Sequence, residues 1–201
     1  EFAMSGRGHQ TFRNLGYKVS QTAVGSLIRL VHHYVTHRTW ASLAALLRHP
    51  DVLECLAKTA DQTLAELDIF RSETFAVGVD DPPTPHAAKT HASTLALPKR
   101  LDEWLKPFIQ NDLRFASRSA AVARWLEATF GLDQPSSPAH WRTESAAKSV
   151  IDWLSHQADV DASLEPDFSS AAIMELLVSA TQSLRIPDIE ADERIPILGW
   201  L

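Results

Sequence analysis

The sequence predicts an all-α protein, an irregular bundle of about seven to eight helices with one or two short strands near the termini. Apolar residues recur at the three- and four-residue spacing of a buried helix face in one segment after another. Glycine is rare, at seven of 201 residues, which argues against a β-sandwich with many tight turns. Tryptophans are spread along the chain and are expected to anchor the helices: Trp40, Trp104, Trp125, Trp141, Trp153 and Trp200.

The first part of the chain predicts a short strand followed by helices. Leu15, Tyr17 and Val19 alternate with polar residues, as in a strand. The next segment carries one helical stripe: Val24, Leu27, Ile28, Val31 and Val35. Thr39 is placed to cap the following helix, because its hydroxyl can accept a hydrogen bond from a backbone N–H group of the first turn. That helix is apolar at Trp40, Leu43, Ala44, Leu46 and Leu47.

The run Arg48-His49-Pro50-Asp51 predicts a corner between two helices. The residue before a proline is disfavoured in the α region, so the second helix should end near His49. Pro50 suits the first turn of a third helix, and Asp51 is favourable near its positive end. We expect Arg48, His49 and Asp51 to form a structural corner with a cap and a charge pair. After a break near 59–61, a fourth helix should bury three residues: Leu64, Leu67 and Phe70.

Residues 78–94 differ in composition from the segments around them. Three prolines stand within four positions, which predicts a semi-extended linker between two helical subdomains. The expected division is a cloning scar at 1–4, an N-terminal helical subdomain at 5–77, the linker at 78–94, a C-terminal helical subdomain at 95–186, and an acidic linker with a truncated apolar segment at 187–201. Because the tail stops within an apolar stretch, we expect the chain to be an excised piece of a longer protein.

The second half repeats the helical pattern. One stripe comprises Leu101, Trp104, Leu105, Phe108 and Ile109. Pro107 should kink or end that helix. A second stripe comprises Val122, Trp125, Leu126 and Phe130, and Gly131 should be its C-cap. Another helix is expected over 147–154, and a last one should begin after a cap at Asp167 or Ser169 and stop at Pro187.

A single cysteine, Cys55, excludes an intrachain disulfide and favours a reducing, cytoplasmic location. Because Cys55 stands in an apolar run, we expect it to be a small core residue. No apolar run approaches the ~18–20 residues that a membrane span needs. The start of the chain lacks the apolar region of a signal peptide. The sequence therefore predicts no membrane partner.

Charge is unevenly distributed along the chain, whose net charge is −6. Residues 1–60 hold seven Lys and Arg against three Asp and Glu, whereas the rest holds twelve against twenty-two. This asymmetry is compatible with scattered surface charge or with a face that meets nucleic acid. Arg29, Arg38 and Arg48 are the candidate DNA contacts on the second interpretation.

The sequence predicts no catalytic, cofactor or metal site. The Gly-Arg-Gly run at 6–8 lacks the Gly-Lys-Ser/Thr of a phosphate-binding loop. His33 and His37 share a helix face, but no metalloprotease glutamate or third ligand accompanies them. The PDIE run at 187–190 resembles the opening of a nuclease motif that needs a later Glu-x-Lys, and the last lysine is Lys148. We therefore expect no enzymatic activity; an enzyme would instead show a deep pocket with convergent acids or histidines.

Three stretches resemble a known protein family. LLRHPDV at 46–52 continues through LAELD at 64–68, and ILGWL stands at 197–201. These segments resemble AddB-type subunits B of ATP-dependent helicase–nucleases, large bacterial proteins with a PD-(D/E)xK nuclease domain, and above all the planctomycete members. The shared positions are helix-packing positions and carry no catalytic group.

The resemblance implies that the nucleotide-binding and nuclease residues lie outside residues 1–201. The chain would then be a non-catalytic helical domain of a DNA-repair helicase–nuclease-like protein, which scaffolds the rest of the parent polypeptide and contacts DNA without a cofactor. The alternative is a helical protein–protein interaction module, which should expose an apolar surface at the cut ends of the chain. This alternative predicts oligomers or a fold that depends on a partner, and the oligomeric state itself stays open.

Overall fold

The computed structural model describes residues 16–56, 60–110, 114–132, 140–158 and 169–186. In chain order its elements are β1 (Tyr17–Lys18), the 3-10 helix η1 (Val19–Gln21), α1 (Ala23–His37), α2 (Trp40–Leu47), α3 (Pro50–Leu56), α4 (Ala60–Thr74), α5 (Pro85–Thr90), α6 (Ala92–Leu95), α7 (Leu97–Trp104), α8 (Lys106–Ile109), α9 (Phe115–Phe130), α10 (Trp141–Ala158), α11 (Ser170–Ser183) and β2 (Arg185–Ile186). The predicted all-α fold with short strands is confirmed.

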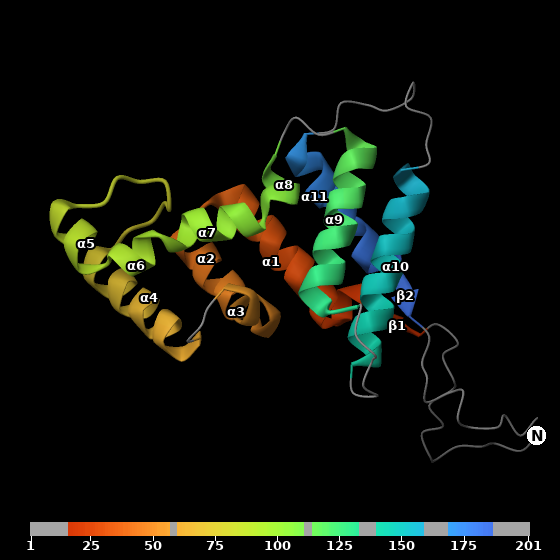
Figure 1. Cartoon of the computed structure of the whole chain (residues 1–201), viewed down its shortest axis with the longest axis horizontal. Helices are drawn as coiled ribbons and strands as arrows, with labels where there is room; N and C mark the ends of the chain where they lie inside the picture. Colours follow the sequence, from red (N-terminus) through yellow and green to blue (C-terminus); the bar gives the residue numbers. More distant parts are fainter. Residues whose placement is uncertain (1–15, 57–59, 111–113, 133–139, 159–168, 187–201) are drawn as a thin grey trace, which may run out of the picture.

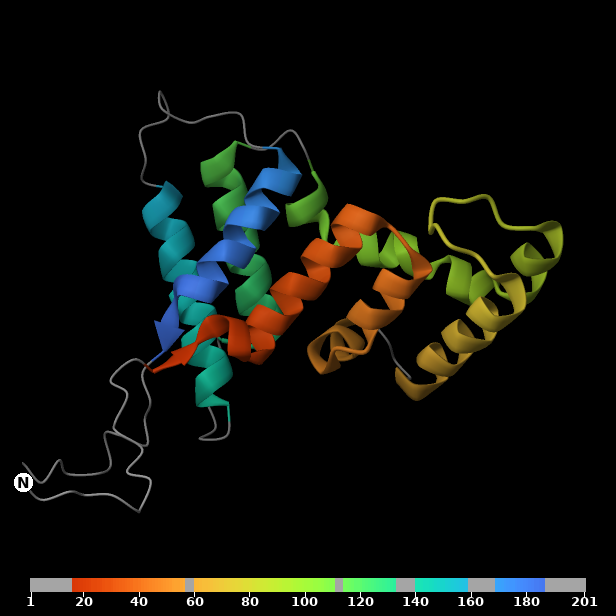
Figure 2. The ribbon, with the colours of Figure 1, turned by 180° about the vertical axis from the view of Figure 1, so that it is seen from behind.

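The helices form an elongated arrangement around α1. In Figures 1 and 2, α1 crosses the middle of the molecule, α2–α7 extend to one side, and α8–α11 stand together at the other. Helix α1 packs against α2 and α11, and α9 packs against α10. Within the described ranges, no helix combines the length and the apolar character needed to cross a bilayer.

Helix α1 is the central element of the core. Its predicted stripe is buried at Val24, Leu27, Ile28 and Val31, whereas Val35 is half-buried. Burying one such side chain stabilises the fold by roughly 1.5–3 kcal/mol. Because α1 contacts elements on both sides of the molecule, this burial joins the two halves.

The predicted helix caps are largely confirmed. The Thr39 hydroxyl accepts a hydrogen bond from the Ser42 N–H at 3.1 Å, and Ser42 Oγ accepts one from the Thr39 N–H at 3.1 Å. Ser169 caps α11, with its hydroxyl 3.2 Å from a backbone N–H of the first turn; Asp167, the other predicted cap, lies outside the described residues. Gly131 ends α9 in the left-handed region, at φ 59°. These local signals therefore determine most of the helix ends.

Pro107 separates two helices, as its position predicts. Helix α7 ends at Trp104, and α8 begins at Lys106 with the proline in its first turn. The aromatic residues on either side of the break pack onto α9. The Trp125 ring lies 4.7 Å from the Trp104 ring and 4.8 Å from the Phe108 ring, measured between centroids.

The prediction that Cys55 is a core residue is wrong, because Cys55 is exposed. Helix α3 is short and lies on the outside of the molecule (Figure 1). It contacts α2 and α9 and buries Val52, whereas Cys55 faces solvent. An apolar run in such a helix does not bury all of its members.

The segment 78–94 holds more helix than its composition predicts. Thr84 caps α5 by accepting a hydrogen bond from the Ala87 N–H at 3.2 Å, and Pro85 occupies the first turn. Proline is favourable there because that position needs no N–H donor. Pro85 therefore starts a helix, and the division into two subdomains stays a prediction. Residues 1–15 and 187–201 lie outside the described residues. They include the predicted cloning scar, the acidic linker and the truncated apolar segment.

The strands join distant parts of the chain. β1 pairs with β2 in antiparallel register, with Tyr17 opposite Ile186. The Val19 N–H extends this pairing by donating to the Leu184 carbonyl at 3.0 Å. These bonds hold η1 beside the end of α11.

Gly25 allows α1 to approach the turn that precedes it. A Cβ atom at this position would lie 2.3 Å from the Val19 carbonyl oxygen and 2.5 Å from the Ser20 Cα, both backbone atoms. We expect Gly25→Ala to lower the free energy of unfolding by about 1–3 kcal/mol, as at other overpacked sites. Urea denaturation followed by circular dichroism measures the change. Arg29→Ala, at an exposed position of the same helix, is the control. Equal stability of Gly25→Ala and the unsubstituted protein would contradict the close approach.

Candidate functional site

Arg38 follows α1 and binds two carboxylates from distant parts of the chain. Its Nη1 and Nη2 donate to Asp102 of α7 at 2.5 and 2.9 Å, and its Nε and Nη2 donate to Asp80 at 3.1 and 2.8 Å. Nη1 also donates to the Tyr34 hydroxyl at 3.1 Å, and that hydroxyl donates to Asp102 at 3.0 Å. One guanidinium thus ties the end of α1 to α7 and to the segment before α5.

The electrostatics of this group favour the charged pairs. Hydrogen bonds to Asp80 and Asp102 raise the pKa of Arg38 further above its ordinary value. Hydrogen bonds from Arg38 lower the pKa of Asp80. Burial, and then the charge of Asp102, raise the pKa of the Tyr34 phenol. At neutral pH, therefore, Arg38 is charged, Asp80 is ionised and Tyr34 is neutral.

Backbone contacts hold the segment after α4 beside the start of α2. Thr39 and Gly78 form an isolated antiparallel bridge, and the Trp40 N–H donates to the Val77 carbonyl at 3.0 Å. The Gly78 N–H donates to the Asp81 carboxylate at 2.8 Å and closes a turn. The prolines that follow are thereby placed over the side chain of Trp40.

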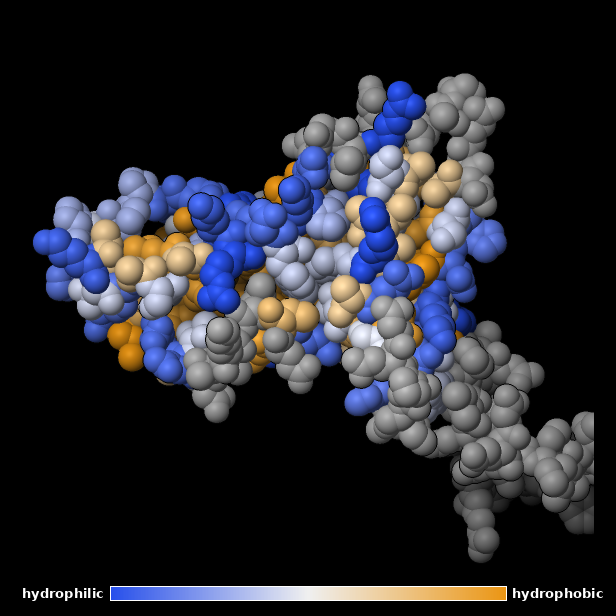
Figure 3. All heavy atoms as spheres, in the orientation of Figure 1, coloured by the Kyte–Doolittle hydropathy of each residue, from blue (hydrophilic) through white to orange (hydrophobic). Residues whose placement is uncertain are grey.

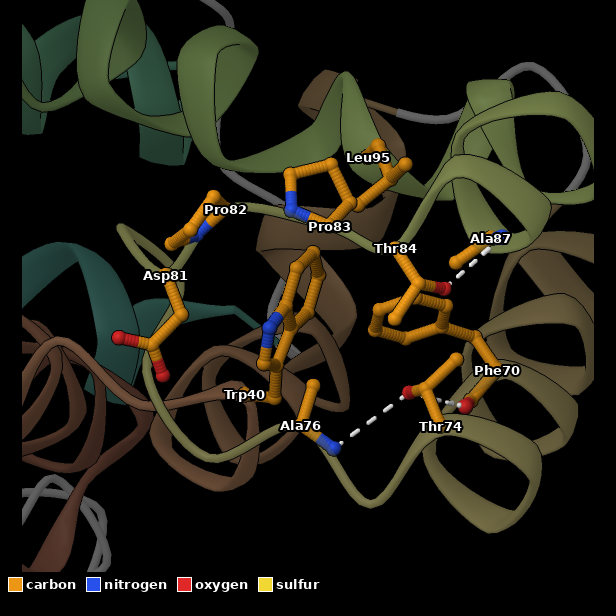
Figure 4. A pocket seen from close by; sticks show the side chains of 10 residues that line it. All are labelled: Trp40, Phe70, Thr74, Ala76, Asp81, Pro82, Pro83, Thr84, Ala87 and Leu95. Atoms are coloured by element: carbon orange, nitrogen blue, oxygen red, sulfur yellow. Dashed lines mark hydrogen bonds between the residues drawn. The ribbon is translucent and has the colours of Figure 1, made fainter.

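This turn and α5 border a small apolar pocket (Figure 4). The pocket encloses about 160 Å³ and is lined by Trp40, Phe70, Thr74, Ala76, Asp81, Pro82, Pro83, Thr84, Ala87 and Leu95. The Trp40 and Phe70 rings pack against each other inside it, with centroids 4.6 Å apart. An apolar cavity of about 150 Å³ is known to accept benzene, so this pocket has room for one large side chain.

The two threonines and the aspartate of the lining already form hydrogen bonds within the protein. Thr84 Oγ1 accepts from the Ala87 N–H, and Thr74 Oγ1 donates to the Phe70 carbonyl at 2.7 Å. The Asp81 carboxylate accepts from a backbone N–H. A polar ligand group would lose its water and gain few new hydrogen bonds here, which is unfavourable. The pocket is therefore suited to an apolar group.

Large apolar side chains lie exposed beside the pocket. Phe75 is 84% exposed and Val77 is 70% exposed, and both are neighbours in sequence of the lining residue Ala76. Ile69 of α4 is 51% exposed. Figure 3 shows hydrophobic residues among hydrophilic ones at the end formed by α4–α6. We call Ile69, Phe75, Val77 and the pocket the apolar end.

The structure places the three candidate DNA contacts in different surroundings. Arg29 is exposed on α1, and Arg38 is occupied by its two carboxylates. Arg48, after the end of α2, binds Asp68 of α4 through Nη2 at 2.8 and 3.0 Å. Two of the three guanidinium groups thus form ion pairs within the protein.

The corner at 48–51 holds the contacts that a structural role needs. His49 is buried, and its Nε2 lies 3.1 Å from the Ala23 carbonyl oxygen. Its Nδ1 lies 3.3 Å from Asp51 Oδ2. These contacts join the start of α3 to the start of α1.

Three further described histidines have contacts within the protein: His33, His37 and His91. The His33 and His37 rings stack at 4.3 Å between centroids, and both residues are exposed. In the part of the chain that the structure describes, no three His, Cys, Asp or Glu side chains are grouped to hold a metal ion. His91 Nε2 lies 2.9 Å from Glu73 Oε2, and its ring packs edge-on against Phe70. This histidine links α4 to the junction of α5 and α6.

The pocket is the feature that the sequence did not reveal. Trp40 and Phe70 were correctly expected to be buried, but nothing in their spacing shows that they meet beneath a proline-rich turn. The sequence feature that could have indicated the pocket is Asp81 followed by Pro82 and Pro83. A turn residue before two prolines makes a rigid segment, which can cover the side chains beneath it.

Comparison with protein-family models, with curated proteins and with solved structures finds no match to this chain in any of the three. The likeness of residues 46–52, 64–68 and 197–201 to AddB-type subunits therefore stays a prediction. The first two stretches lie on α2–α3 and on α4, and the third lies outside the described residues.

Arg38 and Arg48 offer a matched comparison of two ion-paired arginines. Arg38→Met leaves two carboxylates and a buried phenol without their donor, and we expect a loss of about 1.5–3 kcal/mol in unfolding free energy. Arg48→Met breaks an exposed pair and should cost less than about 1 kcal/mol. Urea denaturation of both variants measures the difference. Equal losses would contradict the central role of Arg38.

Asp80 should make stability depend on pH in the acid range. Its pKa is lowered in the folded protein, so the unfolded chain takes up the proton first and acid favours unfolding. The contribution of Asp80 to the free energy of unfolding is complete above the ordinary carboxyl pKa of about 3.9. It is lost as the pH falls through the lower pKa that Asp80 has in the folded protein. We expect unsubstituted protein and Asp80→Asn to differ by less than about 1 kcal/mol at pH 6, because Asp80 is largely exposed, and this difference to disappear as the pH falls well below the ordinary carboxyl pKa. Urea denaturation between pH 7 and pH 2.5 checks this, and a difference independent of pH would refute it.

Proposed function

We propose that this chain is a non-catalytic helical domain that binds another protein segment through its apolar end. The observation that carries the proposal is Phe75, which is almost fully exposed and has a positive φ of 53°. A bulky residue in the left-handed region is strained, and strain of this kind clusters at sites of binding and function. Val77 is also exposed, and Ala76, which stands between the two residues in sequence, lines the pocket.

The exposed apolar side chains contribute little to the stability of the fold and would contribute more to the stability of a complex. Phe75 follows α4, and its N–H donates to the Arg71 carbonyl at 3.3 Å, which holds the left-handed turn. The side chain nevertheless points to solvent and adds little burial. Covering one such side chain in a complex would contribute roughly 1.5–3 kcal/mol. An apolar surface of this kind, surrounded by polar residues, is typical of an interaction site.

Membership in a DNA-repair helicase–nuclease-like parent is a second proposal, supported by the sequence resemblance. In such a protein the apolar end would dock the rest of the parent polypeptide and scaffold the assembly. DNA contact through Arg38 or Arg48 would have to displace Asp80, Asp102 or Asp68, whereas Arg29 is exposed. Titration of duplex DNA at low salt tests this contact; binding that is unchanged in Arg29→Ala would argue against it.

Selection of random displayed peptides on the immobilised 201-residue chain tests the interaction. We expect enriched peptides that bind the chain at least about ten-fold more tightly than they bind the double variant Phe75→Ser/Val77→Ser, since two apolar contacts are removed. Fluorescence anisotropy with synthetic peptides measures the ratio.

Leu176→Ser is the matched control, because Leu176 is an exposed apolar residue on α11, away from the apolar end. Circular dichroism verifies that all variants keep their helices. Absence of enriched peptides, or equal binding to the double variant, would refute the proposed function.

A further inference from the structure

We infer that the pocket of the apolar end takes one large aliphatic or aromatic side chain from a protein segment that carries Lys or Arg within a few residues of it. This inference rests on the proposed function and identifies the chemistry of the partner. It is argued from the size of the pocket, the state of its polar groups and the charge at its edge.

The pocket has the size and rigidity to hold a single side chain. Its volume of about 160 Å³ is close to that of a cavity known to accept benzene. Trp40 and Phe70 are themselves buried, so the surrounding helices fix their rings. Pro82 and Pro83, which also line the pocket, have restricted backbones. A preformed site loses little conformational entropy on binding, which favours an anchor residue.

The lining selects an apolar anchor. Its threonines and Asp81 already form hydrogen bonds within the protein. A serine or asparagine placed in the pocket would exchange its bonds to water for contacts with Trp40 and the prolines. That exchange is unfavourable, whereas leucine, isoleucine, methionine or phenylalanine would lose only contact with water.

The negative charge at the edge of the pocket favours a basic residue in the bound segment. Asp81 is the ionisable residue of the lining, and Figure 4 shows it beside Pro82 with its carboxylate pointing away from the aromatic rings. Asp80 is adjacent and 65% exposed on its side chain. Arg38 is shared between Asp80 and Asp102, so one guanidinium faces several carboxyl groups at this edge.

Among the described basic residues of α4 and α5, none lines the pocket. His86 and Lys89 of α5 are exposed, and neither lines the pocket. Arg71 of α4 lies 4.0 Å from Asp68. The negative excess beside Asp81 is therefore open to a Lys or Arg of the partner, which electrostatic complementarity would orient.

Asp81 borders the pocket directly, so the basic residue should stand one to three positions from the anchor, at about 3.3 Å of extended chain per residue. Peptides enriched on the chain should show this combination. For each of two such peptides, a version with the anchor changed to Ser and a version with the basic residue changed to Glu are made. Fluorescence anisotropy on the whole chain should show about ten-fold or greater weakening for the first change and about two- to ten-fold for the second.

Variants of the protein test the two elements separately. Ala76→Leu should fill the pocket, weaken binding at least about ten-fold and leave the melting temperature unchanged or raised. Ala87→Val is the second filling variant, for use if the first does not fold. Asp81→Asn keeps an oxygen for the Gly78 N–H and removes the charge, so the basic peptides should bind about two- to five-fold more weakly and with a smaller dependence on salt.

The outcomes separate this inference from the proposed function. If no peptide binds in a way that depends on Phe75 and Val77, the proposed function fails and the inference fails with it. If peptides bind through those residues but tolerate Ser at the anchor, Glu at the basic position, or a filled pocket, the function stands and the inference is wrong. Loss of affinity in all three comparisons supports both.

Discussion

The ion pairs of Arg38 are the constraint on which the rest of this structure depends. Only Arg38 and Thr39 separate α1 from α2, so the chain must turn within two residues. Arg38 achieves this with φ 51° and ψ 41°, a left-handed conformation that costs a non-glycine residue about 1–2 kcal/mol. Its bonds to Asp80 and Asp102 offset that cost and orient α2, α7 and the proline turn together. Trp40 and Asp81, which both line the pocket, are held in place by this side chain together with the backbone bridge between Thr39 and Gly78.

Much of the fold could be predicted because helices are governed by local rules. The stripe on α1, the Thr39 cap, the break at Pro107 and the Gly131 stop each depend on residues within a few positions of one another. Helix propensity and capping act over that range, and in these segments tertiary packing is compatible with the helices that they favour. The proline-rich segment was misjudged because the same residue that breaks a helix interior also begins a helix, and the choice depends on Thr84 before it.

The candidate site could not be predicted in the same way, because its parts meet only after folding. Arg38 was expected to be an exposed cation, yet its partners stand 42 and 64 residues further along the chain. Arg118 lies on the buried side of α9 with its Nη2 at 2.5 Å from the Gln110 carbonyl oxygen, although a charged residue is normally placed at the surface. Whether a charged side chain is buried depends on the partners that folding brings to it, and residue types and spacing along one sequence do not identify those partners.

The pairing of β1 with β2 and of α1 with α11 has a consequence for synthesis. Ribosomes deliver the N-terminal part of a chain first, so α1 emerges well before the helix that completes its burial. Contacts between segments so far apart in sequence also form slowly. During that interval α2 is the available cover for the apolar stripe of α1, and it follows after two residues. The tight turn at Arg38 therefore lets α2 cover part of the apolar stripe of α1 in the nascent chain, before the opposite half of the molecule has been synthesised.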